Sequence, residues 1–256
     1  MKKFTKAGEI TWIFGTLLMA LGVAVCKKAD LGVSMIAAPP FIIYEAIGKF
    51  WSGFSVGMVE YLLQGTLLIV LCILIRRFNW RFLLAFLSAV LYGFALDMWL
   101  AILGTEPFEE LWLRWIMLIV GDVSVAISVA FFFRTYLPLQ VYELFVSETA
   151  DRFRFPINKC KLAFDMSFLA LSVVLAFAIF RDANDFDWSK IYQTSFHSIG
   201  AGTVITTIIN APLITVAGRL MDLVFEYDPL FPKAYKLLSR KVQADTDINS
   251  EENVNT

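Results

Sequence analysis

The chain has 256 residues, of which 58% are hydrophobic and only 18% charged, and its mean hydropathy is +0.67. A soluble domain of this length needs far less apolar surface, so the composition indicates an integral membrane protein embedded in a lipid bilayer. The net charge of −1 gives no global basic signal for nucleic acid, so we expect no nucleic-acid partner.

Six segments are long and apolar enough to cross a membrane, which takes about 20 residues at a rise of 1.5 Å each. In chain order they are Ile10–Cys26, Gly57–Ile75, Phe82–Leu103, Leu113–Phe133, Lys161–Phe180 and Ser198–Val224. The basic residues before the first segment resemble a signal peptide, but no small-residue cleavage site follows them. We therefore expect the first segment to be a retained helix.

Two further apolar stretches are too short to cross. Leu31–Gly48 contains Pro39 and Pro40, and Leu137–Val146 contains Pro138. Short segments interrupted by proline are typical of re-entrant or interfacial half-helices.

The distribution of Lys and Arg predicts the orientation. These residues are more frequent in the segments that share a side with the N-terminus than in the alternate loops, so both termini are predicted to be cytoplasmic. The expected organisation is a cytoplasmic N-terminus (1–9), a first membrane repeat (10–103), a second membrane repeat (113–224) and a partly disordered cytoplasmic tail (225–256).

The two membrane regions show a weak internal duplication. At one constant spacing, Gly15 matches Gly121, Ala24 matches Ala130 and Lys28 matches Arg134. At a slightly shorter second spacing, Phe54-Ser-Val-Gly57 matches Phe155-Pro-Ile-Asn158, which sets Gln64 opposite Asp165. A third and looser alignment sets Leu91-Tyr-Gly93 against Ile209-Asn-Ala211.

This duplication predicts the architecture. Each half has three spans, an odd number, so the second half must enter from the opposite side of the membrane. The expected fold is an all-α, polytopic bundle of about six transmembrane helices, built as two inverted three-helix repeats, each with a short broken or re-entrant segment.

Several motifs resemble those of the YczE/YitT-type family of small bacterial multi-pass membrane proteins. They are Lys28-Ala-Asp-Leu-Gly-Val-Ser34, Val141-Tyr-Glu-Leu-Phe145, Phe155-Pro-Ile-Asn-Lys159, Gly200-Ala-Gly-Thr-Val204 and Asn210-Ala-Pro-Leu213. The chain departs from the family pattern at Met35 and at Leu139-Gln140, where that family usually has proline. The resemblance implies a bacterial cytoplasmic membrane protein and assigns no substrate.

Charged and polar groups in the spans are the candidate solute-binding residues. A charged group at the bilayer centre costs about 2.5–3.5 kcal/mol on insertion scales, so each one needs a reason, either a site or an interhelical hydrogen bond. The candidates are Asp122, Gln64, Asp97, Asp165 and Asn210 in the spans, and Asp30 and Glu143 in the broken segments. Asp122, near the middle of its span, is the leading one.

No enzyme motif was found, and the three cysteines, Cys26, Cys72 and Cys160, stand apart with a single histidine in the chain. We therefore expect no metal site, no cofactor and no enzymatic activity. The leading hypothesis is a small secondary transporter or permease for an unidentified small solute. The alternatives are a non-transporting accessory or regulatory protein, acting in a homo-oligomer or with a membrane protein partner, and an intramembrane enzyme on a lipid-linked substrate.

Overall fold

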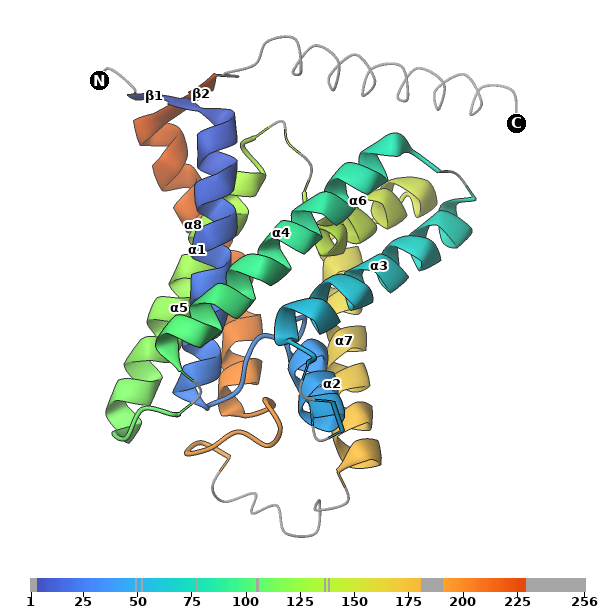
Figure 1. Ribbon diagram of the computed structural model, residues 1–256. Helices are drawn as coiled ribbons and strands as arrows, with labels where there is room; N and C mark the ends of the chain where they lie inside the picture. Colours follow the sequence, from blue (N-terminus) through green and yellow to red (C-terminus); the bar gives the residue numbers. More distant parts are fainter. Residues whose placement is uncertain are drawn as a thin grey trace.

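The computed structural model describes residues 4–48, 50–51, 53–76, 78–104, 106–135, 137, 139–180 and 191–228. Its helices are α1 (Gly8–Ala29), α2 (Ala38–Gly48), α3 (Val56–Ile75), α4 (Trp80–Leu103), α5 (Leu111–Phe132), α6 (Val141–Phe153), α7 (Ile157–Ile179) and α8 (Ala201–Val224). Two short strands, β1 (Phe4–Ala7) and β2 (Phe225–Asp228), flank them. Figure 1 shows the arrangement.

The six longest and most apolar helices, α1, α3, α4, α5, α7 and α8, are each long enough to cross a membrane. Large apolar side chains lie on their outer surfaces, among them Ile73, Ile208 and Leu223. Such a surface suits contact with lipid and not with water. The predicted fold class, a polytopic helical membrane bundle, is confirmed.

The two short helices differ from their predicted bounds. In α2, Pro39 and Pro40 fall in the first turn, where a missing N–H costs no helical hydrogen bond. The prolines therefore start the helix instead of breaking it. In the second half, α6 begins only at Val141 and continues to Phe153, beyond the predicted end at Val146.

The helices pack in two groups (Figure 1). In one group α1 lies along α5, and α8 covers the other side of α5. In the other, α2, α3, α6 and α7 pack against one another. The long helix α4 crosses between the groups, because it packs on α1 in the first and on α3 and α6 in the second.

Glycines allow the closest approaches between helices. A Cβ at Gly22 of α1 would meet the carbonyl oxygen of Gly121 in α5 at 2.6 Å. Gly57 of α3 and Gly93 of α4 face each other in the same way. Small residues at such crossings let membrane helices pack backbone to backbone.

Strands β1 and β2 pair in parallel, from Phe4 opposite Phe225 to Ala7 opposite Asp228. The start of α1 and the end of α8 therefore lie at the same end of the bundle, which we call the strand end. The opposite end, where α1 ends and α8 begins, we call the loop end (Figure 1). Residues 225–228, predicted as tail, are thus a strand, and 229–256 lie outside the described residues.

Candidate functional site

A small cavity of about 50 Å³ lies among the helices of both groups. Its lining includes side chains from all six long helices, from the segment that leads into α2 and from the start of α6. The apolar part of the lining comes mainly from α1 and α5. The polar part consists of Ser34, Glu60, Tyr92, Gln140, Tyr142, Glu143, Lys161 and Asn210.

The first turn of α6 brings three of these side chains together. Gln140 is the N-cap residue of α6, and Tyr142 and Glu143 follow it. Between them, Val141 is fully buried in an apolar cluster with residues of α3 and α4. The ring of Tyr142 packs edge-on against Phe168 of α7, with centroids 5.6 Å apart. Packing on both sides fixes this turn beside the cavity.

Several buried polar atoms around the cavity have no hydrogen-bond partner. They are the amide oxygen and nitrogen of Gln140, the Tyr142 hydroxyl, Oε2 of Glu143 and Oδ1 of Asn210. Gln140 is only 2% exposed and Tyr142 3%. Buried polar atoms in folded proteins are nearly always hydrogen-bonded, so these atoms have the character of a binding site for a polar ligand or water.

Glu60 is held at the cavity by its neighbour one turn along α3. The Gln64 amide nitrogen donates a hydrogen bond to Oε1 of Glu60 over 3.1 Å. The Gln64 amide oxygen accepts one from the backbone N–H of Val141 over 3.3 Å. Gln64 therefore connects α3 to the start of α6 and orients the Glu60 carboxylate.

Acidic groups outnumber basic ones at the cavity. Glu60 and Glu143 both line it, and the two carboxylates lie close enough to interact electrostatically. Lys161 is the basic residue of the lining, and its Nζ lies 3.6 Å from the Asp165 carboxylate one turn further along α7. The positive charge of Lys161 is thus shared with Asp165.

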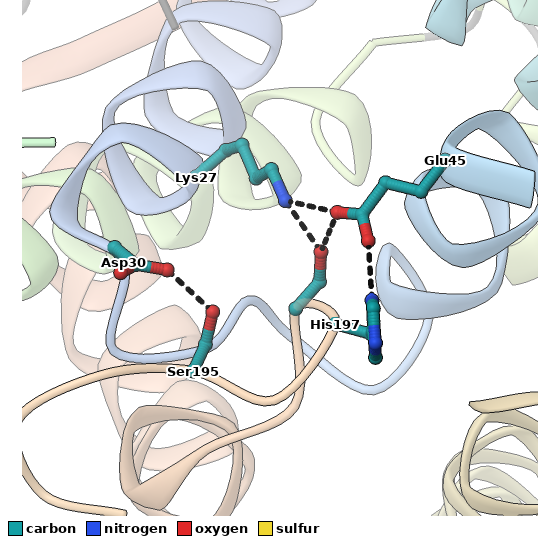
Figure 2. A network of polar contacts seen from close by, with 6 residues as sticks. Lys27, Asp30, Glu45, Ser195 and His197 are labelled. Carbon is teal, nitrogen blue, oxygen red and sulfur yellow. Dashed lines mark hydrogen bonds and ion pairs between the residues drawn. The ribbon is translucent and has the colours of Figure 1, made fainter. Parts of the chain in front are cut away.

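A second polar cluster joins α1, α2 and the segment before α8 at the loop end (Figure 2). Lys27 and Glu45 point toward each other and form an ion pair of 2.9 Å. The Lys27 ammonium also donates to the Ser198 hydroxyl over 2.6 Å. The other Glu45 oxygen lies 2.8 Å from Nδ1 of His197, whose ring stacks on Phe180, the residue that follows α7.

This loop-end cluster perturbs the Glu45 carboxyl. Burial raises the pKa of Glu45, but the charge and hydrogen bond of Lys27 and the contact with His197 lower it more, so its pKa lies below the ordinary value. Lys27, Glu45 and His197 therefore hold together three separate elements of the chain.

The seven candidates predicted from the sequence fall in different places. Glu143 and Asn210 line the cavity. Gln64 and Asp165 do not line the cavity, but each contacts a residue that does. Gln64 donates a hydrogen bond to Glu60, and Asp165 forms an ion pair with Lys161.

The remaining three are elsewhere. Asp97 accepts hydrogen bonds from the Ser55 hydroxyl and the backbone N–H of Gly57 at the start of α3. Asp30 accepts one from the Ser195 hydroxyl (Figure 2) and pairs with Arg114 at 3.6 Å. Asp122 is buried in α5 and is not among the residues that line the cavity.

The sequence prediction did not select Glu60, Tyr92, Gln140, Tyr142 or Lys161. Glu60 carried a usable signal, a carboxylate inside the second span one turn before Gln64. Tyr92 and Gln140 carried none, because a tyrosine inside an apolar span and a glutamine at the start of a helix are both ordinary. Among the described residues, no group of three His, Cys, Asp or Glu side chains is arranged to hold a metal ion.

The sequence model of a family of unknown function, DUF6198, matches residues 7–219, which include all six long helices and every residue of the cavity. The chain belongs to this family. No curated protein and no solved structure matches it. Membership of DUF6198 agrees with the predicted family resemblance only in placing the chain in an uncharacterised family.

Proposed function

We propose that the protein is a small secondary transporter or permease for a small solute, built as two inverted three-helix repeats around the central cavity. The observation that carries the proposal is a cavity lined by side chains of all six long helices, in which buried polar atoms have no hydrogen-bond partner. Transporters built from inverted repeats bind their substrates between the repeats, beside interrupted helices. Here the start of α6 and the segment before α2 both reach the cavity.

The lining itself supports the repeat. Every lining residue except Ile214 is matched to another lining residue by the spacings found in the sequence. At the first spacing the pairs are Met19 with Val125, Val23 with Val129, Ser34 with Gln140, Ile36 with Tyr142 and Ala37 with Glu143. At the second spacing Glu60 pairs with Lys161, and the third alignment pairs Tyr92 with Asn210. A cavity lined by matched pairs is what an axis relating the two halves would produce.

The helix packing gives independent support. Helix α1 packs on α4 as α5 packs on α8, and α2 contacts α3 and α7 as α6 contacts α7 and α3. Two correspondences are missing, both of them contacts of α8. Helix α4 packs on α3 and on α6, whereas α8 has no comparable packing on α7 or on α2. Such a difference between halves is expected of a transporter captured in one of its two access states.

The membrane and the orientation are part of the proposal. The excess of Lys and Arg on the side of the N-terminus favours cytoplasmic termini, and the parallel pairing of β1 with β2 is consistent with termini on a common side. The YczE/YitT-type resemblance favours a bacterial cytoplasmic membrane. Fusion of a reporter that fluoresces only in the cytoplasm to each end would test both points.

The test is solute counterflow in proteoliposomes. Vesicles are loaded with one unlabelled solute, and entry of the same radiolabelled solute is followed for guanidinium, methylammonium, acetate, phosphate, glycine and glycerol in turn. We expect one class of solute to enter faster than into protein-free vesicles. If none does, and the purified protein instead retains a second membrane protein in fixed ratio, the accessory hypothesis replaces this one.

The unpartnered atoms argue against that accessory hypothesis, which expects every buried polar group to be satisfied between helices. The absence of enzymatic activity stays a prediction. An intramembrane enzyme using Asp97 and Asp122 needs the two carboxylates in contact. Asp97 instead caps α3 through Ser55 and Gly57.

A further inference from the structure

We infer that the central cavity binds a small organic cation with several N–H donors, of the class of guanidinium or a short alkylammonium. This inference rests on the proposed function, because it names the solute class of the same site. It is carried by the charge, the hydrogen-bonding atoms and the size of the cavity.

The charge of the lining is negative. Glu60 and Glu143 contribute two carboxylates. Among the described lining residues the one ammonium, that of Lys161, acts on Glu143 and also on Asp165 at 3.6 Å, so the carboxylates outnumber it three to one. A buried carboxylate is stable only when it is paired or hydrogen-bonded. Glu60 has a single neutral donor, the Gln64 amide, and Oε2 of Glu143 has no hydrogen-bond donor. A cation with N–H groups, placed between the two carboxylates, would supply the further hydrogen-bond donors that both lack.

The unpartnered atoms are mostly acceptors. Oε2 of Glu143, the Gln140 amide oxygen and Oδ1 of Asn210 accept hydrogen bonds and donate none. The Tyr142 hydroxyl lies beside Glu60 but outside hydrogen-bonding geometry. A ligand that satisfies such a set must bring several N–H groups, which an anion cannot do. Planar N–H cations also bind carboxylates through two parallel hydrogen bonds.

The size and the aromatic residues limit the ligand further. A buried water needs about 10–15 Å³, so a cavity of about 50 Å³ admits a ligand of only a few heavy atoms. Tyr92 and Tyr142 line the cavity, and aromatic rings attract cations, above all planar ones such as guanidinium.

Comparison of the two repeats shows where the negative charge comes from. Glu143 occupies the position that Ala37 has in the first half, so its carboxylate has no counterpart across the proposed axis. Glu60 is matched by Lys161, which is neutralised by its own neighbour Asp165. The acidic side of the site therefore lies between α3 and α6.

The first test uses the unmodified protein. Binding is measured by isothermal titration calorimetry on the full chain in detergent, with guanidinium chloride at millimolar concentration, far below the molar range that unfolds proteins. Urea has nearly the same shape without the charge, and acetate has the opposite charge. We expect guanidinium and methylammonium to bind, and urea and acetate not to bind. Binding of urea or acetate as tight as that of guanidinium overturns the inference, as does failure of both cations to bind.

Variants then locate the site. Glu143→Gln and Glu60→Gln each remove one carboxylate, and each should weaken guanidinium binding about tenfold or more, since a hydrogen bond to a charged group is lost. Glu109→Gln removes the same charge from an exposed loop and should bind as the unmodified protein does. Undiminished binding in both cavity variants would place the cation elsewhere and overturn the inference.

Equilibrium binding and counterflow separate the two proposals. If guanidinium binds but does not exchange across the vesicle membrane, the cation site stands and the transporter proposal falls. If acetate or phosphate exchanges while neither cation binds, the transporter proposal stands and the cation inference falls.

Discussion

Most buried hydroxyls of the spans are satisfied within their own helix, whereas the polar groups of the cavity are not. Thr16, Ser128 and Ser172 each donate to the carbonyl oxygen four residues earlier. Among the described residues with unpartnered buried atoms, all except Thr149 line the cavity or, as with Asp165, contact a residue that does. A hydroxyl bonded within its own helix needs no other partner, so the exceptions are the groups on which the proposed binding site rests.

Tyr142→Phe separates function from stability. The variant removes a buried hydroxyl that makes no hydrogen bond, so the free energy of unfolding should stay the same or rise. Solute binding should weaken about tenfold, because the ligand loses one polar contact in a dry site. Calorimetric binding and thermal unfolding of the same preparation measure both. Tyr44→Phe, outside the cavity on α2, is the control and should change neither. A variant that loses stability in parallel with binding would show that the hydroxyl is structural.

The loop-end cluster predicts a dependence of stability on pH. Because the pKa of Glu45 is lowered in the folded protein, its ionised form stabilises the fold above the ordinary carboxyl pKa of about 4.3. That contribution is lost as the pH falls below this value and through the lowered pKa. The contribution of Glu45 to the melting temperature should be level from about pH 7 to 5 and fall in more acidic solution.

Glu45→Gln should melt at a lower temperature than the unmodified protein at neutral pH, and the difference between the two should shrink in acid. Glu109→Gln, which removes an exposed carboxylate, should follow the unmodified profile. A constant difference at every pH would mean that the Glu45 charge does not contribute. The cluster itself was not predicted from the sequence, because Lys27, Glu45 and His197 come from segments far apart in the chain.

At the scale of elements, the spans were predictable and their ends were not. A span needs a run of apolar residues of known length, and such a run is a local property of the sequence. The ends depend on capping contacts that the sequence does not display. Helix α3 begins at Val56 because Ser55 caps it and Asp97 of α4 accepts the Gly57 N–H. The pairing of β1 with β2 joins the two ends of the membrane region and has no local signal at all.

The crossing of α3 and α4 depends on the absence of side chains at Gly57 and Gly93. A Cβ on Gly57 would clash with the Gly93 carbonyl and would lie 2.5 Å from Oδ2 of Asp97. Gly57→Ala should therefore destabilise the protein by about 1–3 kcal/mol through overpacking.

Gly65→Ala is the matched control on the same helix. Its Cβ would meet only the ring edge of Phe86 at 3.1 Å, which can turn aside. Gly65→Ala should gain about 1 kcal/mol in helix propensity, and Gly57→Ala less because it lies in the first turn, so a loss beyond about 1 kcal/mol relative to the control reports the crossing. Unfolding in detergent measures it, and equal stability of the two variants would mean that the helices separate easily at this point.

At the scale of the whole molecule, the proposed site depends on the proposed relation between the repeats and not on any single residue. Asp122 leads the candidates predicted from the sequence because it is a lone charge in the middle of a span. The polar side chains of the cavity instead come from α3, α4, α6, α7, α8 and the segment before α2, at the junction of the two groups of helices. The lining residues could have been predicted from the duplication alone, by asking which matched positions lie close to the axis proposed to relate the two halves. A chemical search for isolated charges could not find them.

The unequal packing of the two halves leads to a last prediction. If the protein alternates between two access states, α7 should at times approach α8 as α3 approaches α4 in this structure. The counterparts of Gly57 and Gly93 are Asn158 and Ala211. Cysteines at these two positions should therefore form a disulfide in membranes, in a background without Cys26, Cys72 and Cys160, although α7 and α8 do not pack together here.

The pair Asn158→Cys with Val204→Cys is the control, since Val204 lies about two turns from Ala211. The counterpart of Val204 in the first half is Phe86, which lies beside Gly65 of α3 and not beside Gly57. Cross-linking of the first pair alone, with loss of counterflow that a reducing agent restores, would support an exchange between the halves. Cross-linking of neither pair under any solute condition would mean that the separation of α7 from α8 is permanent. The cavity would then be a fixed binding site, and the symmetry of its lining would record the duplication without a transport cycle.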